Sequence, residues 1–296
     1  MNARETLHSK NARLIKVFDN LLDTLRNFIR ENHVTHEEYR HAVAFLGEVG
    51  QKGEASLLCD VFVEVSVDEI DNDGRAGTIT TIEGPFYVPN APALKSPCVL
   101  PQRPNEPGPV LFFSGTVRSE NGIPLPGATL DLWQSDTNGR YSHFDIPEVE
   151  APYNLRARVT TDQSGKFEVQ TRVPGPYEIP KHGPTGALLA ALGRHAWRPA
   201  HLHMKVESHG YRTLTTQLFF KNDSWIDSDV VQGAVKQSLI VDPIKHEDPN
   251  ELLRKGMRDP YYTLAYDFVL ETGLPKPREI GGNSRANSPG MLRFLA

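Results

Sequence analysis

The chain has 296 residues, of which 39% are hydrophobic and 23% are charged, and its formal net charge is −5. This composition is typical of a globular protein with a core of its own, and it argues against a disordered chain or a nucleic-acid-binding protein. Two cysteines cannot form a disulfide framework, the first residues do not resemble a secretory signal, and no apolar run approaches the roughly 20 residues of a membrane span. We therefore expect a cytoplasmic protein with no membrane span.

The N-terminal quarter of the chain is predicted to be helical. Apolar residues recur every three or four positions from Leu14 to Phe28, which gives a broad amphipathic stripe. Thr35 and Glu38 form a capping-box pattern that begins a further helix. A third segment has a helical pattern, although its centre at residues 61–63 is also typical of a strand. The expected helices cover residues 12–30, 35–50 and 54–70.

The composition then changes. Seven prolines between residues 89 and 109 predict a connector without regular structure. From Val110 onward, short apolar runs alternate with turn residues such as Asn121-Gly122 and Asn138-Gly139, which is typical of an antiparallel sandwich or barrel. The expected strands cover residues 110–118, 128–133, 156–161, 166–173, 201–207, 213–220 and 261–271.

These patterns predict an α+β fold class, in which an antiparallel β-sandwich follows an N-terminal helical region. The tail is rich in Gly, Pro, Ser and Asn, and we expect it either to be loosely ordered or to pack as an arm. The expected organisation is a helical region over 1–88, the connector over 89–109, the sandwich over 110–272 and the tail over 273–296.

A His-x-His pattern lies in one of the expected strands. Side chains two positions apart point to the same face of a strand, so His201 and His203 should project side by side, with Cα atoms about 6–7 Å apart. Leu202 and Met204 should face the opposite side. The pair suits two neighbouring ligands of one metal, but two solvent-facing histidines would also fit the pattern.

The remaining ligands of such a metal cannot be derived from spacing alone. The common zinc patterns are absent from the sequence. A triad of two histidines and a carboxylate could draw on Asp136, Asp145 or Asp162. Tyr141 and Tyr177 each follow a turn that could bring a phenol inward, although from the residues alone a buried tyrosine with a hydrogen-bonded hydroxyl is the favoured explanation.

Several motifs resemble one known family over nearly the whole chain, from residue 19 to residue 268. The chain is similar to the intradiol ring-cleavage dioxygenases, which include the catechol, chlorocatechol and hydroxyquinol 1,2-dioxygenases. The motifs that carry the resemblance are Ile82-Glu83-Gly84-Pro85-Phe86-Tyr87, Leu132-Trp133-Gln134, Gly139-Arg140-Tyr141-Ser142, Tyr153-Asn154-Leu155-Arg156, Pro176-Tyr177-Glu178-Ile179-Pro180, Gly183-Pro184-Thr185-Gly186, Gly193-Arg194-His195-Ala196-Trp197-Arg198-Pro199-Ala200-His201-Leu202-His203 and Leu214-Thr215-Thr216-Gln217.

The resemblance implies a non-haem Fe(III) ion as the cofactor. In that family its ligands fall on the positions of Tyr141, Tyr177, His201 and His203, whereas Tyr153 matches no ligand position and is interpreted as structural. Phenolate is a hard anionic oxygen donor, and coordination to a trivalent cation keeps a phenol deprotonated far below its usual pKa of about 10. Two phenolates and two neutral imidazoles would leave one net positive charge on a ferric site.

The same resemblance implies roles in catalysis. Tyr177 would be displaced by the diol and would act as a general base for a substrate proton. Arg198 would stabilise negative charge on the substrate, and Gln217 would act from behind the ligands. Without the motif, Arg198 would be read as part of a surface salt bridge. The reaction would consume O2 and open the ring between the two hydroxyls, with no organic cofactor.

The resemblance also points to a substrate pocket. Leu57 and Asp60 on the third helix and the Ile179-Pro180 pair after Tyr177 resemble the hydroxyquinol and chlorocatechol groups. An acidic Asp60 could accept a hydrogen bond from a third hydroxyl, and a site built for that bond penalises analogues that lack it. We therefore expect hydroxyquinol (1,2,4-trihydroxybenzene) as substrate, cleaved to 3-hydroxymuconate and its keto form maleylacetate, with chlorocatechol or catechol as the alternative. The ring's other side would be lined by Ile82, Gly84, Pro85 and Phe86.

The N-terminal helices could act as a lid over the sandwich. In the family they build a homodimer interface, and a phospholipid can occupy a tunnel between the subunits. The apolar stripe from Leu14 to Phe28 is wider than a lone surface helix needs, so we expect a homodimer joined through this region.

Two functions of other classes compete with the dioxygenase. Segments 115–117 and 126–130 also resemble the pre-albumin-like sandwich modules that only bind or space other domains. A metal-dependent hydrolase with His201 and His203 on zinc is the second alternative. Neither would need two tyrosines beside the histidines.

Overall fold

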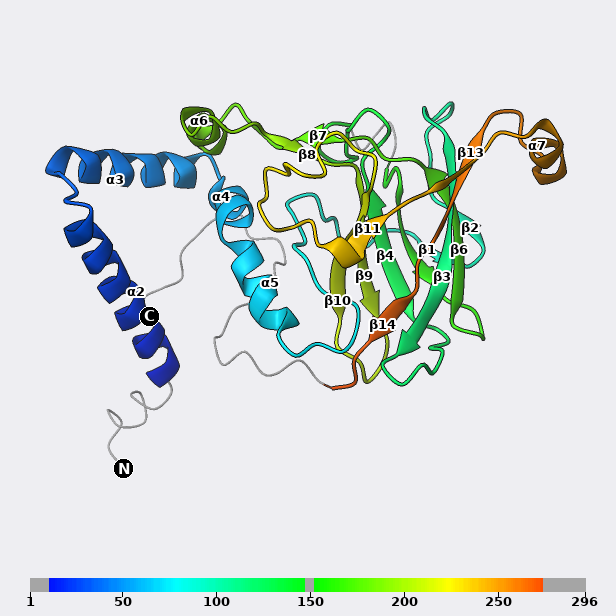
Figure 1. Ribbon diagram of the computed structural model, residues 1–296, viewed down its shortest axis with the longest axis horizontal. Coiled ribbons are helices and arrows are strands. Elements are labelled where there is room, and N and C mark those ends of the chain that lie inside the picture. The colour runs from blue at the N-terminus through cyan, green and yellow to red at the C-terminus, as the bar shows by residue number, and fades with distance from the viewer. Residues whose placement is uncertain (1–10, 147–151, 274–296) are drawn as a thin grey trace. The chain divides into compact units, whose positions relative to one another are not determined.

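The computed structural model describes residues 11–146 and 152–273 of the chain (Figure 1). These residues form two compact units, which comprise residues 11–53 and residues 54–273. None of the described helices is long and apolar enough to cross a membrane. The predicted tail lies outside the described residues, apart from Gly273.

The first unit is a pair of helices, α2 (Ala12–Glu31) and α3 (His36–Gln51), whose ends lie within one residue of the predicted ranges. The predicted capping box is confirmed. The Glu38 amide donates to the Thr35 hydroxyl at 3.2 Å, and the Thr35 amide donates to the Glu38 carboxylate at 2.8 Å. The apolar stripe of α2 is not covered within this unit, since the helix contains no buried residue.

The second unit opens with two short helices, α4 (Ala55–Phe62) and α5 (Glu64–Asn72). The prediction of one helix over residues 54–70 is wrong, because the backbone leaves the helical conformation at Val63, where φ is −135°. Val63 ends α4 and begins α5. The break falls at the β-branched centre whose pattern also fits a strand, and such side chains lose rotamer freedom in a helix.

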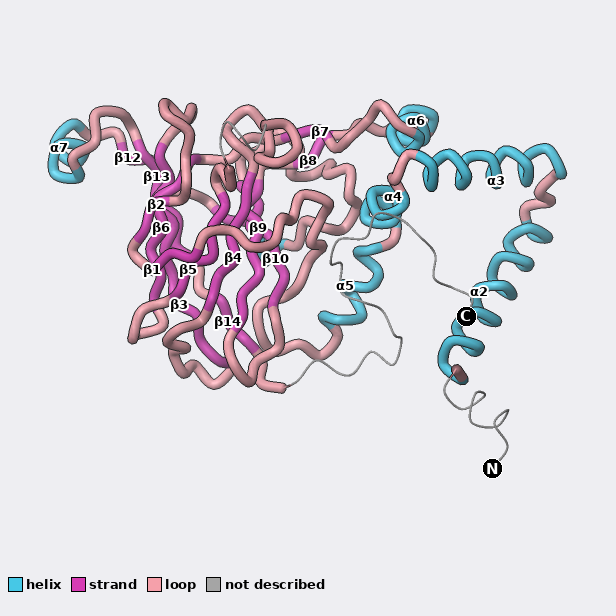
Figure 2. The backbone as a smooth tube through the Cα atoms, turned by 180° about the vertical axis from the view of Figure 1, so that it is seen from behind, coloured by secondary structure: helices cyan, strands magenta, loops and turns pink. Residues whose placement is uncertain are grey.

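The rest of the second unit is built from two six-stranded sheets, which form a sandwich (Figure 2). One sheet has the order β1 (Ala93–Lys95), β5 (Arg156–Thr160), β4 (Thr129–Gln134), β9 (His201–Glu207), β10 (Leu214–Phe220) and β11 (Ile240–Val241). The other has the order β12 (Ile244–His246), β13 (Tyr261–Ala265), β3 (Val110–Ser119), β6 (Lys166–Arg172) and β2 (Cys98–Val99), and β14 (Phe268–Leu270) also pairs with β3.

The core lies between these sheets. Leu130 and Val206 of the first sheet and Phe113 and Phe167 of the second are at most 2% exposed and belong to one continuous apolar cluster. The rings of Phe113 and Phe167 meet edge to face, with centroids 5.0 Å apart. Leu202 and Met204 are buried in the same cluster, so the predicted division of β9 into two faces is confirmed.

The predicted fold class is confirmed, but the sheets are mixed rather than wholly antiparallel. The central strands β5, β4, β9 and β10 pair antiparallel, as do β3 and β6. Parallel pairs are made by β1, β2, β11, β13 and β14, which are short strands reached by long connections rather than by hairpins.

Two further predictions on secondary structure need correction. The proline-rich connector is not free of regular structure, because β1 and β2 lie within it and add to the edges of the two sheets. The last expected strand is divided into β13 and β14. Two helices had no prediction: α6 (Pro184–Ala191) and α7 (Pro249–Lys255), the second of which begins at the N-cap Asp248 and ends at Gly256.

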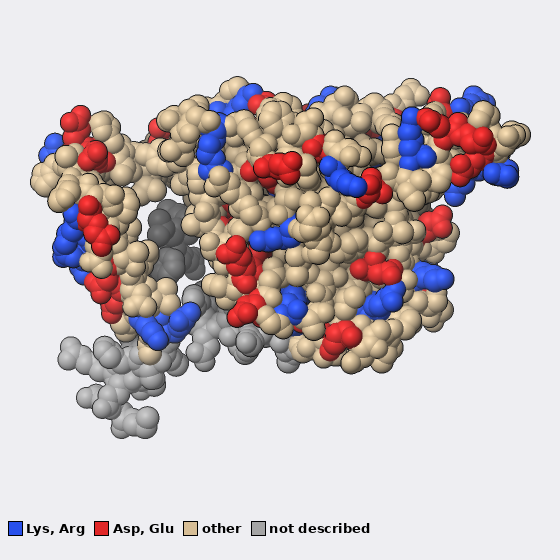
Figure 3. Space-filling model, in the orientation of Figure 1, with Lys and Arg blue, Asp and Glu red and all other residues tan. Residues whose placement is uncertain are grey.

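A small two-stranded sheet lies beyond one end of β9 (Figure 1). It consists of β7 (Tyr177–Glu178) and β8 (Trp197–Arg198), and it pairs Tyr177 directly with Arg198. Figure 3 shows acidic and basic side chains interspersed over the face that it draws, with no continuous basic stripe among the described residues of that face.

Candidate metal centre

Four side chains from three separate segments converge at this end of the sandwich. Tyr141 follows the turn after β4, Tyr177 lies on β7, and His201 and His203 lie on one face of β9. All four are buried, with at most 4% of their surface exposed. The two phenol rings meet edge to face with centroids 5.1 Å apart, and the centroids of Tyr177 and His201 are 5.6 Å apart. The alternative of two solvent-facing histidines is therefore wrong.

The two imidazoles present their ε nitrogens to the same point. His201 Nε2 and His203 Nε2 are 2.8 Å apart. Two nitrogens bound at about 90° to one metal, with bonds of about 2.1 Å, would be about 3 Å apart. His201 Nδ1 donates to the Pro199 carbonyl at 2.6 Å, and this bond sets the tautomer that leaves Nε2 with a free lone pair. The ring of His203 is held by Trp133, which stacks on it at 4.7 Å.

Three polar atoms of the cluster have no hydrogen-bond partner of normal geometry among the described residues: the hydroxyls of Tyr141 and Tyr177, and Nδ1 of His203. An unsatisfied buried polar group costs about 1–3 kcal/mol, so three in one cluster call for an explanation. A cation bound between the oxygens and the ε nitrogens would satisfy both hydroxyls.

Burial sets the protonation of all four groups. It raises the pKa of Tyr141 well above the usual value, and it raises the pKa of Tyr177 despite the nearby Arg198 guanidinium. Burial also lowers the pKa of His201 and His203 well below their usual value, and the positive charge of Arg198 adds to this effect. In the metal-free protein at neutral pH, the site therefore consists of two neutral phenols and two neutral imidazoles.

The carboxylates considered as ligands have other tasks. Asp136 pairs with Arg103 and Arg140, and Asp145 accepts a hydrogen bond from the Tyr141 amide at 2.9 Å. Asp162 accepts backbone hydrogen bonds within an exposed turn. In the part of the chain that the structure describes, no group of three or more His, Cys, Asp or Glu side chains could hold a metal ion. A triad of two histidines and a carboxylate is therefore absent there.

Arg198 is 1% exposed and lies against the cluster, so its interpretation as a surface salt bridge is wrong. Its Nε and Nη2 donate to the Asp229 carboxylate, and Nη2 also donates to Gln217 Oε1 at 3.0 Å. The Gln217 amide in turn donates to the Ile82 carbonyl at 2.7 Å. Burial lowers the pKa of Arg198, but the Asp229 carboxylate outweighs it and holds the pKa above the usual value. The guanidinium is therefore charged.

Sequence reasoning missed two residues of this region. Asp229 follows no recognisable motif; the only signal was the general need of a buried arginine for a carboxylate, which does not say which one. Arg156 is 1% exposed and donates to the Phe86 carbonyl at 2.6 Å and the Ser142 hydroxyl at 2.7 Å. It thereby ties the segment before β1 to the residue that follows Tyr141.

The residues expected in the substrate pocket are mostly buried. Leu57 and Asp60, three positions apart on one face of α4, are 6% and 3% exposed. Phe86 stacks on Tyr141 with ring centroids 4.5 Å apart, and a side chain at Gly84 would lie 3.5 Å from the His203 ring. Of the others, Ile82 and Ile179 are buried, Pro85 is half-buried and Pro180 is exposed.

The sequence matches two family models. One, described as the catechol dioxygenase N terminus, matches residues 11–78, and the other, described as dioxygenase, matches residues 82–272. The chain belongs to the intradiol ring-cleaving 1,2-dioxygenases. Members of this family use non-haem ferric iron, O2 and catechol-type substrates, so a module that only binds or spaces other domains is excluded.

Related dioxygenases cover most of the chain. It is 42% identical to a chlorocatechol 1,2-dioxygenase of Rhodococcus opacus over 78% of this chain and 90% of the relative. Among solved structures, it is similar to a hydroxyquinol 1,2-dioxygenase of Pseudomonas putida DLL-E4, with 37% identity, a TM-score of 0.79 and coverage of 89% of this chain and 93% of the other. It is also similar to a catechol 1,2-dioxygenase of Pseudomonas arvilla C-1, with 33% identity, a TM-score of 0.81 and coverage of 94% and 91%.

The turn before Tyr141 must lie close to the Tyr177 segment, and this makes a prediction for Gly139. Its φ is +79°, and a side chain there would lie 2.4 Å from the Pro176 carbonyl oxygen and 3.0 Å from Tyr177 Cβ. We expect Gly139→Ala to destabilise the protein by about 2–4 kcal/mol and to reduce diol turnover, as measured by denaturant unfolding and oxygen uptake.

Gly122→Ala is the matched control. Gly122 has the same φ of +79°, but a side chain there would meet no atom within 4 Å. This variant suffers only the backbone strain, about 1 kcal/mol, and should retain activity. Equal effects of the two substitutions on stability and turnover would contradict the close approach of the two tyrosine segments.

Proposed function

We propose that the chain binds one ferric ion through Tyr141, Tyr177, His201 and His203 and cleaves hydroxyquinol between its 1,2-hydroxyls with O2. The observation that carries the metal site is the convergence of two unsatisfied phenol oxygens and two ε nitrogens in one buried cluster. Hard phenolate oxygens suit a trivalent ion better than zinc, whose common sites use Cys, His and carboxylates. The alternative of a zinc hydrolase does not explain why two tyrosines lie beside the histidines.

Ferric iron would supply a Lewis acid that keeps phenols deprotonated and draws electron density from a bound diol, so that a ring carbon reacts with O2. Tyr177 would take a proton from the diol at its Oη, because its phenolate is freed when the diol binds. Arg198 would stabilise negative charge on the substrate oxygens, since its guanidinium is charged and buried beside the site. Gln217 would hold Arg198 and the Ile82 carbonyl in place.

The proposed substrate follows from the character of the expected pocket. Leu57, Ile82, Phe86 and Ile179 are buried apolar side chains of the core, and such side chains would suit the face of an aromatic ring. Asp60 is a buried carboxylate on the same helix face as Leu57, and it could accept a hydrogen bond from the third hydroxyl of hydroxyquinol. Chlorocatechol is the second candidate, because the identity of 42% to a chlorocatechol 1,2-dioxygenase exceeds the 34% to a hydroxyquinol 1,2-dioxygenase of a Rhizobium species.

Comparison of three diols tests this function. We expect the iron-loaded protein to consume one O2 per molecule of hydroxyquinol, and to show a kcat/KM for hydroxyquinol at least about tenfold above those for catechol and 4-chlorocatechol. Oxygen-electrode and mass-spectrometric assays would measure both. Equal or better turnover of catechol would refute the substrate assignment, and no turnover of any diol would refute the dioxygenase proposal.

Substitution of Asp60 separates its role from that of the apolar wall. Asp60→Asn keeps the size of the side chain but weakens the acceptor, and Asp60→Ala removes it. We expect both variants to reduce kcat/KM for hydroxyquinol by about 10- to 100-fold with much smaller effects on catechol. Glu69→Gln, which neutralises an exposed acid on α5, serves as the control. An unchanged preference in Asp60→Ala would contradict the proposed hydrogen bond.

Removal and return of the metal should depend on pH. The pKa values of the two tyrosines lie above about 10 and those of the two histidines below about 6.5 in the metal-free protein. Between these limits, iron binding as a bis-phenolate releases two protons, so its apparent affinity should rise by about two log units per pH unit. Chelator competition between pH 7 and 9 would measure the slope, and Tyr141→Phe should halve it. A slope near zero would contradict two phenolate ligands.

The exposed apolar stripe of α2 supports the proposal of a homodimer. The N-terminal family model covers this helix, and a continuous exposed apolar face needs a partner. A two-fold interface would place the same helices against each other, and a phospholipid could fill any apolar space left between them. Light scattering at micromolar concentration should give twice the mass of the chain, whereas a monomer would contradict the proposal. Lipid extraction followed by mass spectrometry would detect the lipid, and its absence would refute that part alone.

A further inference from the structure

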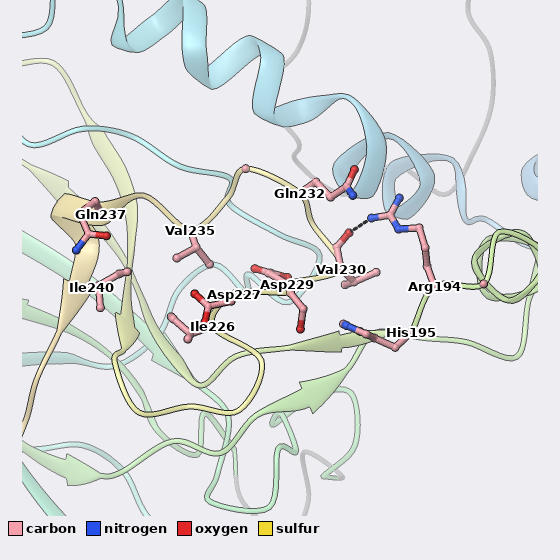
Figure 4. Close-up of a pocket in the computed structure, with 13 residues that line it drawn as sticks. Arg194, His195, Ile226, Asp227, Asp229, Val230, Gln232, Val235, Gln237 and Ile240 are labelled. Carbon is pink, nitrogen blue, oxygen red and sulfur yellow. Dashed lines mark hydrogen bonds between the residues drawn. The ribbon is translucent and has the colours of Figure 1, made fainter.

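A cleft of about 660 Å³ is lined by Arg194, His195 and residues of the segment from Ile226 to Ile240 (Figure 4). Its lining includes Asp229, which belongs to the loop between β10 and β11. Asp229 is 7% exposed, and its carboxylate binds Arg198 through both oxygens. It therefore stands between solvent in the cleft and the buried guanidinium.

The contacts of Arg198 show what Asp229 does for the guanidinium. A guanidinium has five N–H donors in a fixed plane. Nε and one hydrogen of Nη2 are directed to Asp229, at 3.1 Å and 3.0 Å, and the other hydrogen of Nη2 is directed to Gln217. Nη1 is not used by Asp229 or Gln217; it lies 3.5 Å from His201 Nε2, and the guanidinium also interacts with Tyr177. Asp229 thus fixes the plane of Arg198 so that one edge with two donors faces the ligands.

We propose that Asp229 is a positioning residue for Arg198, and that the cleft behind it admits small carboxylates that can take its place. The inference rests on the proposed dioxygenase function, in which Arg198 stabilises charge on the substrate. Loss of the carboxylate leaves the guanidinium charged and without its two-point contact, so that Gln217 alone no longer fixes the plane on which electrostatic stabilisation depends.

Asp229 also accepts a hydrogen bond from the Val231 amide at 3.0 Å, so it contributes to the loop as well. Asp229→Asn separates the two roles. The amide oxygen can still accept from Val231, but it brings no negative charge to Arg198 and cannot bind it through two oxygens. Asp229→Ala removes both roles and leaves space next to the cleft.

Chemical rescue is the test. With the iron-loaded protein and hydroxyquinol, we expect kcat to fall by about 10- to 100-fold in Asp229→Ala and Asp229→Asn, with a much smaller change in KM. Sodium formate should restore the kcat of Asp229→Ala saturably, by about tenfold, relative to sodium chloride at equal ionic strength. Formate should leave Asp229→Asn unchanged, because the amide still fills the space.

The matched control is Asp131→Ala. Asp131 is another carboxylate with little exposure, 8%, and it accepts a hydrogen bond from Tyr87 rather than from Arg198. This variant should lose stability but keep its kcat, and formate should not change it. A folded Asp229→Ala with the kcat of the wild type, or equal stimulation of Asp131→Ala by formate, would overturn the proposal.

A second readout needs neither iron nor turnover. In the metal-free protein, formate should raise the unfolding midpoint of Asp229→Ala, because it binds only the folded state. It should raise neither that of the wild type nor that of a double variant that also carries Arg198→Met. Absence of this shift would overturn the proposed exchange of carboxylates. If the wild type cleaves no diol, the dioxygenase proposal fails, and the unfolding experiment still decides whether Asp229 and formate exchange on Arg198.

Discussion

The site depends on the register of β9 between its two neighbours. His203 pairs with Trp133 of β4 and with Gln217 of β10, and His201 pairs with Phe219 of β10. These pairs place an aromatic ring against each imidazole and the amide of Gln217 beside them. A shift by one residue would turn both histidines into the apolar core and bring Leu202 to the site. The large apolar residues that β9 buries between the sheets thus fix the position of the polar residues on its other face.

The second constraint on the site is electrostatic. The buried site contains four neutral groups and the positive charge of Arg198, which Asp229 balances. A second buried guanidinium, that of Arg156, lies over the Tyr141 ring. Such a cluster is costly in the metal-free protein, since two phenol hydroxyls lie in a dry environment with no hydrogen bond of normal geometry to the described residues. Binding of a trivalent ion, with release of the two phenol protons to solvent, would remove that cost. The ion and its four ligands would then carry one net positive charge, which would attract an anionic diol. The cost of the metal-free site and its affinity for a hard cation therefore have the same origin.

Much of the fold could be predicted from local sequence. The first two helices were predicted from the spacing of apolar residues and from the Thr35 and Glu38 capping box. The main strands were predicted from short apolar runs that alternate with turn residues. The edge strands β1 and β2 could not be predicted, because they depend on contacts distant in sequence. The break at Val63 falls where the local pattern also fitted a strand. The Asp248-Pro249 start and Gly256 end of α7 were present as a readable signal, but the short helix between them has no strong apolar period.

The residues of the site also differ in whether local sequence predicts their position. The strand period alone placed His201 and His203 side by side, because that geometry is local. The positions of Tyr141 and Tyr177 at the site depend on how two turns fold against β9. Residue patterns therefore did not predict whether these tyrosines are ligands, and only the family motifs pointed to them. Asp229 lies outside those motifs and became visible only as the counter-ion of a buried arginine. Residues that act through a partner leave little trace in a single sequence.

The metal and its tyrosine ligands can be tested together by the iron content and visible spectrum of the purified protein. We expect about one iron per chain and a broad visible band from phenolate-to-iron charge transfer, which Tyr141→Phe and Tyr177→Phe should each shift or weaken. Tyr153→Phe, at a half-buried tyrosine whose hydroxyl donates to the Pro89 carbonyl, should leave the band unchanged. Stoichiometric zinc in a colourless protein that cleaves diols without iron would contradict the proposed iron site.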